Sequence, residues 1–207
     1  MKKQSKKKTK ILAVGDIHGD TGLVKKLVER AKKEDVDLVI IAGDLTLVES
    51  SYKNLIGPFT RIKKPVLLIH GNHESIATVD FLAEMYSNTK NLHGYSFKKD
   101  DLGIFGAGGA DFGITQISDK KMFETLKKAH KDIKDSKIKI MITHMHPEGS
   151  KSEFSGFRGN SGIRKAIKEF KPELHIHGHI HEAEGADEKI GNTRVINVGK
   201  KGMVFEI

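Results

Sequence analysis

The chain has 207 residues, of which 36 are lysine or arginine and 27 are aspartate or glutamate, and its formal net charge is +9. This length suits one domain with its own hydrophobic core and leaves no room for a second large domain. Because the chain contains no cysteine, disulfide frameworks and thiolate metal sites are excluded. A bound metal ion must therefore be held by His, Asp, Asn or Glu side chains.

The positive charge is concentrated at the start of the chain, where MKKQSKKKTK contains six lysines, so that three of the nine excess charges remain for the rest. We expect residues 1–9 to form a disordered basic tail and residues 10–207 to form a single domain. Docking of the tail on nucleic acid is the alternative. The tail lacks the apolar core of a secretory signal, and no stretch approaches the roughly 18 apolar residues of a membrane span, so we expect a cytoplasmic protein without membrane contact.

From residue 10 onward, short apolar runs alternate with amphipathic stretches. Strands are predicted for KILAVGD, DLVIIAGD and PVLLIHGNH, and a helix for GLVKKLVERAKK between the first two. Farther on, FLAEMYSNT predicts a short helix. The first part of the chain thus reads strand, helix, strand, loop, strand.

The remaining chain continues the same alternation. YSFKKDDLGIFGAGGAD predicts a hairpin, and KKMFETLKKAHKDIKD an amphipathic helix on the surface. A strand in KIKIMITH, a helix in GIRKAIKEF and a strand in ELHIHGH follow, and short strands close the chain in EKIGNTRVINVG and KGMVFEI. Strands with little polar alternation indicate sheets that are buried on both faces, so the sequence predicts a layered α/β fold.

Carboxylate, amide and imidazole side chains follow the ends of five predicted strands. The candidates are Asp16, His18, Asp44, Asn72, His73, His144, His179 and His181. In open α/β sheets, ligands bind in the crevice beyond the carboxyl ends of the strands, so these residues are expected to form one site. The mixture of donors suits Mn, Fe, Zn, Co or Ni ions better than calcium.

The motifs GDIHG, AGDL, GNHE, MITH and GHIH occur in the order and approximate spacing found in calcineurin-like metallophosphoesterases. From Ile11 to about Gly199 the chain resembles this superfamily, and five short motifs in order are specific where any one alone is weak. The resemblance implies an α-β-β-α sandwich of mixed sheets flanked by helices. In the Ser/Thr protein phosphatases of this superfamily an Asp-Arg-Gly element follows the second motif, whereas here Asp44 is followed by LTLVES. The resemblance therefore favours the small single-domain phosphodiesterase or phosphatase branch.

The resemblance also implies a role for each residue of the site. One metal ion would be bound by Asp16, His18 and His181, the other by Asn72, His144 and His179, with Asp44 bridging both. Two divalent ions would clamp a small phosphoester substrate and acidify a shared water, whose hydroxide attacks phosphorus. His73 would act as general acid or stabilise the transition state, and the alternative is that it only orients a ligand.

The eleven histidines leave some assignments open. Within HIHGHIH the family pattern favours His179 and His181, and His177 stays an alternative ligand. In THMHP we prefer His144, which ends the strand, whereas His146 is either a substrate contact or a loop residue without a role. We expect His70 to be structural near the site.

Other polar residues carry weaker expectations. We expect Glu74, Asp101, His93 and His130 at the surface. In the loop before GIRKAIKEF, Arg158 suits a phosphate oxygen, whereas Asn160 or Ser161 suits a helix cap. Asn197 in INVG is a further candidate for substrate contact.

Two alternative functions compete with that of a metal-dependent phosphoesterase. One is a non-catalytic scaffold with the same fold, which the filled ligand positions disfavour. The other involves nucleic acid, either as the substrate of a phosphodiesterase or as a partner bound through the lysine-rich tail. Nothing in the sequence sets an oligomeric state.

Overall fold

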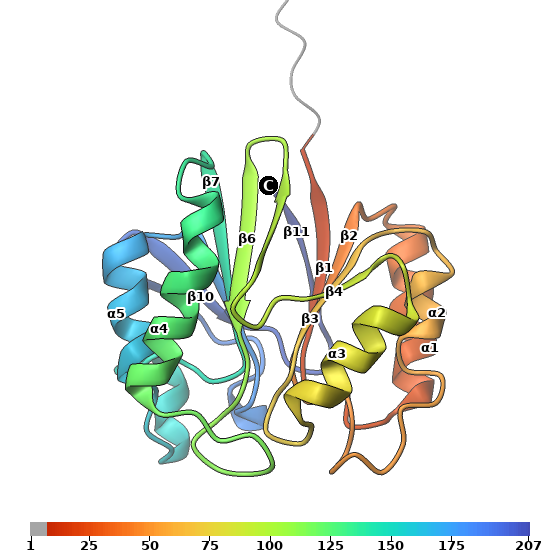
Figure 1. Ribbon diagram of the computed structural model, residues 1–207, viewed down its shortest axis with the longest axis horizontal. Helices are drawn as coiled ribbons and strands as arrows, with labels where there is room; N and C mark the ends of the chain where they lie inside the picture. The colour runs from red at the N-terminus through yellow and green to blue at the C-terminus, as the bar shows by residue number, and fades with distance from the viewer. Residues whose placement is uncertain (1–7) are drawn as a thin grey trace, which may run out of the picture.

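The computed structural model describes residues 8–207, which form two β-sheets face to face with helices on both outer sides (Figure 1). This is the predicted α-β-β-α sandwich. The first sheet contains β1 (Lys10–Val14), β2 (Leu38–Ala42), β3 (Val66–Ile69), β4 (Thr89–Asn91) and β11 (Met203–Glu206). The second contains β5 (Ser96–Lys99), β6 (Leu102–Ala107), β7 (Ile138–Thr143), β8 (Leu174–His177), β9 (Asp187–Ile190) and β10 (Thr193–Asn197).

Both sheets are mixed, as predicted. The first has the order β11-β1-β2-β3-β4, in which β1 to β4 are parallel and β11 pairs antiparallel with β1. The second has the order β5-β6-β7-β8-β10-β9, with four parallel strands between antiparallel edges. The carboxyl ends of the parallel strands therefore gather at one side of the molecule, at the bottom of Figure 1.

Helices cover the outer faces of the two sheets (Figure 1). The α-helices are α1 (Thr21–Lys33), α2 (Gly57–Thr60), α3 (Ile76–Met85), α4 (Asp119–His130) and α5 (Ser161–Phe170). Three short 3-10 helices are η1 (Lys131–Ile133), η2 (Lys151–Ser155) and η3 (His181–Ala183). The first three α-helices pack on the first sheet, and α4 and α5 pack on the second.

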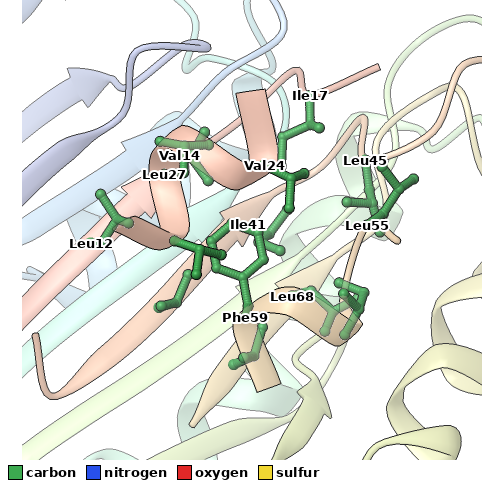
Figure 2. Close-up of a cluster of buried hydrophobic side chains, with 14 of the residues drawn as sticks. Leu12, Val14, Ile17, Val24, Leu27, Ile41, Leu45, Leu55, Phe59 and Leu68 are labelled. Atoms are coloured by element: carbon green, nitrogen blue, oxygen red, sulfur yellow. The ribbon is translucent and has the colours of Figure 1, made fainter. Parts of the chain in front are cut away.

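The core consists of three apolar layers, one between the sheets and one beneath each set of helices. Along β1, Leu12 and Val14 face the helices, as Figure 2 shows, while Ile11 and Ala13 face the other sheet. The central strands thus bury both faces, which explains the nearly unbroken apolar runs in the sequence. No helix in the part of the chain described is long and apolar enough to cross a bilayer.

Polar caps fix where the helices begin. The side chain of Asp20 accepts a hydrogen bond from the backbone N–H of Leu23 at 2.8 Å, and Ser118 caps α4 in the same way. Asn160 caps α5, because its side chain accepts from the N–H of Ile163 at 3.0 Å. Of the two roles considered for that loop, the helix cap is the one observed for Asn160.

Several element boundaries differ from the predicted ones. The helix expected from Phe81 begins five residues earlier, at Ile76, because Ser75 supplies its cap. The short strand β4 and the single turn α2 were not predicted. Residues 1–7 of the predicted tail lie outside the described residues. Thr9, also assigned to the tail, pairs with Ile207 through two backbone hydrogen bonds of 2.8 and 3.0 Å.

Candidate metal centre

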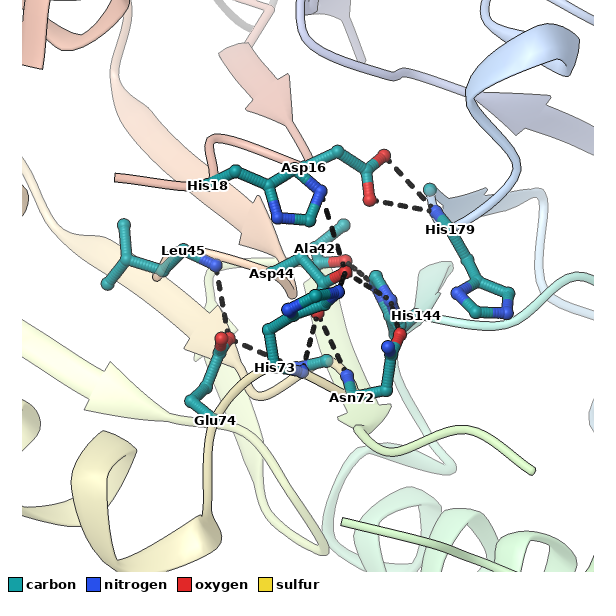
Figure 3. Close-up of polar contacts among 12 residues, drawn as sticks. Asp16, His18, Ala42, Asp44, Leu45, Asn72, His73, Glu74, His144 and His179 are labelled. Carbon is teal, nitrogen blue, oxygen red and sulfur yellow. Dashed lines mark hydrogen bonds and ion pairs between the residues drawn. The ribbon is translucent and has the colours of Figure 1, made fainter. Parts of the chain in front are cut away.

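The eight predicted site residues come together at the carboxyl ends of five strands, and Figure 3 shows most of them. Asp16 and His18 follow β1, Asp44 follows β2, Asn72 and His73 follow β3, His144 follows β7, and His179 and His181 follow β8. Two of these strands belong to the second sheet and three to the first. The site therefore straddles the two sheets, and parallel strands explain why residues far apart in sequence meet there.

Four of these residues hold a backbone conformation that costs free energy. The φ angles are 54° for Asp16, 48° for His18, 50° for Asp44 and 72° for His179. Residues other than glycine pay roughly 1–2 kcal/mol each for the left-handed region. Strained backbone conformations of this kind cluster at functional sites. Here the left-handed conformation sets the direction in which these four side chains leave the backbone.

The first group of donors contains Asp16, His18 and His181. The Nε2 atoms of the two histidines lie 3.1 Å apart, and His181 Nε2 is 3.7 Å from Asp16 Oδ1. Their ligand atoms all lie within 4.8 Å of one another. One carboxylate and two imidazoles that converge in this way fit a divalent transition-metal ion.

The second group contains Asp44, His144 and His179, with Asn72 beside them. The Nδ1–H of His144 donates to the carbonyl oxygen of Ala42 at 2.9 Å, which turns Nε2 toward the site. That Nε2 lies 3.0 Å from Asn72 Oδ1 and 3.3 Å from Asp44 Oδ2. A backbone carbonyl that fixes the far nitrogen is the usual support of a metal-binding histidine.

Asp44 lies between the two groups. Its Oδ2 is 3.7 Å from His18 Nε2 and 3.3 Å from His144 Nε2, so one oxygen faces donors of both groups. Its Oδ1 accepts hydrogen bonds from the backbone N–H groups of Asn72 at 2.9 Å and His73 at 3.0 Å. The carboxylate is thus held in place from behind while its other oxygen is presented to the site.

In the metal-free site the charge states of His18, His179 and Asp44 suit metal binding, whereas His144 holds a proton that a bound ion would have to displace. Burial lowers the pKa of His18 to about 4 and that of His179 to about 3, so both imidazoles are neutral and offer a lone pair at neutral pH. Burial also opposes charge on His144, but the Asp44 carboxylate outweighs it and raises its pKa to about 9. Burial of Asp44 is likewise outweighed by its ion pair and hydrogen bond with His144, which hold its pKa well below the usual range.

Hydrogen bonds tie the His179–His181 turn to the rest of the site. Both carboxylate oxygens of Asp16 accept from the N–H of His179 at 3.1 Å. Asn197, which we considered as a substrate contact, is fully buried, and its side-chain amide donates to the carbonyl oxygen of Ile180 at 2.8 Å. In the structure Asn197 therefore supports the turn that carries the ligands.

The neighbouring histidines lie outside the donor groups. His177 is buried and its Nδ1–H donates to the carbonyl oxygen of Gly178 at 3.1 Å, which leaves it behind the turn. His175 donates to the hydroxyl of Thr143 at 2.7 Å. His146 is fully buried and donates to the carbonyl oxygen of Phe157 at 3.1 Å, so neither of its expected roles describes it.

The expectation of a surface carboxylate at Glu74 was wrong. Glu74 is fully buried, and its Oε1 accepts from the backbone N–H groups of Leu45 and Gly71, each at 3.1 Å. It thereby joins the loop that carries Asp44 to the loop that carries Asn72. The sequence contained one signal for this position, namely its place within the GNHE motif.

Two further histidines expected at the surface are only partly exposed. His93 packs its ring against His70, with centroids 4.5 Å apart, and His130 stacks on Phe170 at the same separation. Arg158 is exposed, and its guanidinium forms an ion pair with Glu148 at 2.8 Å.

Comparisons with known proteins agree with this geometry. The profile of the calcineurin-like phosphoesterases matches residues 9–183. The protein TT1561 of Thermus thermophilus has a TM-score of 0.76 at 18% identity, with 96% of this chain and 99% of that one covered. For a novel archaeal phosphodiesterase the TM-score is 0.56 at 19% identity, with 96% and 99% covered.

A dimetal phosphatase from Danio rerio has a TM-score of 0.64 at 11% identity, with 91% of this chain and 86% of that one covered. At such identities the solved structures establish the fold alone. Comparison with curated proteins gives no match. The family profile spans most of the chain, and the chain therefore belongs to the calcineurin-like phosphoesterases, a family whose activity is metal-dependent hydrolysis of phosphoesters.

Proposed function

We propose that this protein is a dinuclear metal-dependent phosphoesterase that hydrolyses a small phosphodiester or phosphomonoester. The observation that carries the proposal is the position of Asp44, whose Oδ2 faces His18 at 3.7 Å and His144 at 3.3 Å. A carboxylate oxygen between two sets of donors suits two ions that share one ligand.

The residues divide between two metal positions. One would be held by Asp16, His18 and His181, the other by Asn72, His144 and His179, with Asp44 shared. The donor set of carboxylate, amide oxygen and imidazole suits Mn, Fe, Zn, Co or Ni, and manganese is the first ion to test. When bound, the ions would supply Lewis-acid polarisation of the phosphoryl group and activation of a water nucleophile.

His73 is the residue that we assign to proton transfer. Its ring packs edge to face on His18, with centroids 4.8 Å apart, and its Nε2 lies 3.9 Å from Asp44 Oδ2. The backbone N–H of His73 donates to Asp44 Oδ1, and this hydrogen bond fixes the position of the backbone that carries the ring. Its side chain is 26% exposed, so a substrate can reach it, and we propose that it donates a proton to the leaving oxygen.

A hydrolysis assay tests the proposal. Metal-stripped protein would be incubated with bis(p-nitrophenyl) phosphate or p-nitrophenyl phosphate after addition of Mn, Co, Ni, Zn or Mg, with metal content measured in parallel. We expect two ions per chain and restored turnover, both reduced in Asp44→Asn. Asp187→Asn is the matched control, because that carboxylate is exposed and pairs with Arg194. Two bound ions without turnover of either ester would contradict the proposal and favour a scaffold.

The role of His73 is tested in the same assay through the leaving group. A p-nitrophenolate leaves readily without a proton, whereas an alkoxide needs one, so His73→Ala should lose roughly 10²-fold more rate on an alkyl ester than on a nitrophenyl ester. Metal content should stay at the wild-type level. Equal losses on both esters together with a lost metal ion would make His73 a ligand.

A further inference from the structure

Exposed phenylalanines gather on two loops beside the metal centre. The chain has ten phenylalanines, and the exposed ones are Phe81, Phe112, Phe154 and Phe157. Three of these four lie on the loop between β6 and α4 or on the loop that contains η2. Single apolar side chains at a surface are normal, whereas exposed rings that lie together indicate a binding surface.

Phe112 lies directly against a proposed metal ligand. The residue is 45% exposed, and the centroid of its ring is 5.3 Å from that of His179. The loop is fixed to the metal centre, because the N–H of Ile114 donates to the carbonyl oxygen of Asn72 at 2.8 Å. Thr115 also donates its hydroxyl to the carbonyl oxygen of Glu74 at 2.9 Å.

Phe157 extends the same surface from the other loop. The residue is 52% exposed, and the centroid of its ring is 6.3 Å from that of Phe112, with the ring planes 32° apart. The buried His146 donates to the carbonyl oxygen of Phe157 at 3.1 Å, which anchors this loop to the interior. Gly159 adds a second anchor, because its N–H donates to Glu153 at 2.8 Å.

We propose that Phe112 and Phe157 form an aromatic wall that stacks on a flat, uncharged ring in one ester arm of the substrate, such as a nucleobase or a phenyl group. This inference rests on the proposed hydrolysis at the metal centre and names the class of substrate for it. The wall begins next to His179, so a phosphoester held at the metal centre places its ester arms within reach of the rings.

The composition of the wall favours a ring over other groups. Arg158, which follows Phe157 in sequence, pairs with Glu148 at 2.8 Å at the surface, and the two side chains of the wall themselves carry no charge. Stacking on an aromatic side chain accepts any flat ring because each has a π face. Aromatic pairs prefer offset or tilted arrangements with ring centroids 4.5–7 Å apart, and Phe112 and Phe157 already form such a pair. Both residues are about half exposed, so a third ring can pack against them in the same way.

Binding of non-hydrolysable probes tests the wall without turnover. Phenylphosphonate and methylphosphonate would be titrated calorimetrically into manganese-loaded protein. We expect phenylphosphonate to bind the wild type roughly tenfold or more tightly than methylphosphonate, because stacking of one ring is worth about that much. The preference should disappear in Phe112→Ala/Phe157→Ala. Phe81→Ala is the matched control, because Phe81 is 47% exposed on α3 and should keep the full preference.

Hydrolysis of two diesters with one leaving group complements the titration. Thymidine 5′-methyl phosphate carries a nucleobase on one arm, whereas dimethyl phosphate carries no ring, and release of methanol is followed for both. We expect the thymidine ester to have the higher kcat/KM by roughly tenfold in the wild type, through a lower KM, and to lose that advantage in the double variant. A preference for phenylphosphonate without an advantage for the thymidine ester would assign the wall to aryl groups.

The outcomes separate this inference from the proposed function. Turnover of both diesters with equal kcat/KM, and equal affinity for both phosphonates, would overturn the aromatic wall while hydrolysis stands. Ring-dependent binding without turnover would support the wall and contradict hydrolysis of these esters. Phe112→Leu keeps an apolar side chain and guards against misfolding: unchanged ring preference in Phe112→Leu/Phe157→Leu would show that stacking is not involved.

Discussion

Glu74 is a buried carboxylate that links two loops of the metal centre without facing the metal positions. Burial, together with the nearby charge of Asp44, raises its pKa to about 7 although two backbone N–H groups bond to it. Glu74 holds the two loops together, because the backbone N–H groups that it accepts from belong to Leu45 on one loop and Gly71 on the other. Without the carboxylate, both buried N–H groups would lack a hydrogen-bond partner.

This shift makes the stability of the metal-free protein depend on pH. The folded pKa of Glu74 lies above its unfolded value of 4.5, so the folded state holds the proton more tightly. Its contribution is therefore fully present below pH 4.5 and is lost as pH rises to about 7, by roughly 3 kcal/mol over the whole window. Urea unfolding of Glu74→Gln between pH 4.5 and pH 7.5 should show a flatter dependence than the wild type.

Glutamine is the informative replacement at this position. Its amide oxygen can keep the bonds from Leu45 and Gly71, whereas Glu74→Ala would leave both N–H groups unpaired. An identical pH dependence in Glu74→Gln and in the wild type would show that this carboxylate does not titrate in that window.

The turns after the parallel strands determine how closely the ligand residues approach one another. Gly43, which precedes Asp44, has a φ of 89°, and a Cβ added there would lie 2.5 Å from His144 Nδ1 and 2.9 Å from Gly71 Cα. Both the backbone conformation and the space therefore require glycine. The ring of His144 occupies the volume that a side chain at position 43 would need.

Gly43→Ala should consequently weaken metal binding as well as stability. Gly191→Ala is the matched control, because Gly191 also has a positive φ, 62°, but a Cβ there would meet nothing within 4 Å. The control should cost only the backbone strain of roughly 1–2 kcal/mol. We expect Gly43→Ala to cost more in urea unfolding and to displace His144, which a metal titration would show as weaker binding. Equal effects of the two substitutions would contradict this account.

Sequence reasoning predicted most strands and helices of the fold but missed β4 and α2. Strands β2 and β3 are apolar runs with a glycine and a polar residue shortly after them, and helix α1 has a clear apolar face, so local pattern was enough. Strand β4, with the sequence TKN, has no pattern and exists because it pairs with β3. The antiparallel pairing of β11 with β1 joins the two ends of the chain, which no local signal could indicate.

The same distinction holds at the metal centre. The residues at strand ends were predictable because parallel strands deliver them to one side of the sheets. The placement of His177 behind the turn and of Glu74 beneath two loops depends on how loops from different strands pack. Single-sequence patterns do not contain that information.

The arrangement of the two sheets gives the metal centre a role in the whole molecule. Asp16, His18, Asp44 and Asn72 come from the first sheet, whereas His144, His179 and His181 come from the second. Each proposed metal position draws ligands from both sheets. Bound ions would therefore connect the sheets at the edge where the strained turns lie.

Metal binding should accordingly raise the thermal stability of the protein. An ion at a free concentration 100 times its Kd stabilises the folded state by about 2.7 kcal/mol per site. For a chain of 207 residues that corresponds to a rise in Tm of roughly 5–10 °C per site. The rise should be measured by calorimetry on protein stripped with a chelator and then titrated with manganese.

The metal-induced rise in Tm of ligand variants shows which side chains carry the stabilisation. Asp44→Asn should lose most of the rise because it belongs to both positions, and His181→Ala should lose the part due to one ion. The exposed pair of Asp187 and Arg194 lies outside the ligand set, so Asp187→Asn should keep the full rise. If manganese raises the Tm of the wild type and of Asp44→Asn equally, the Asp44 carboxylate contributes to neither metal position, which would contradict its proposed role as the shared ligand.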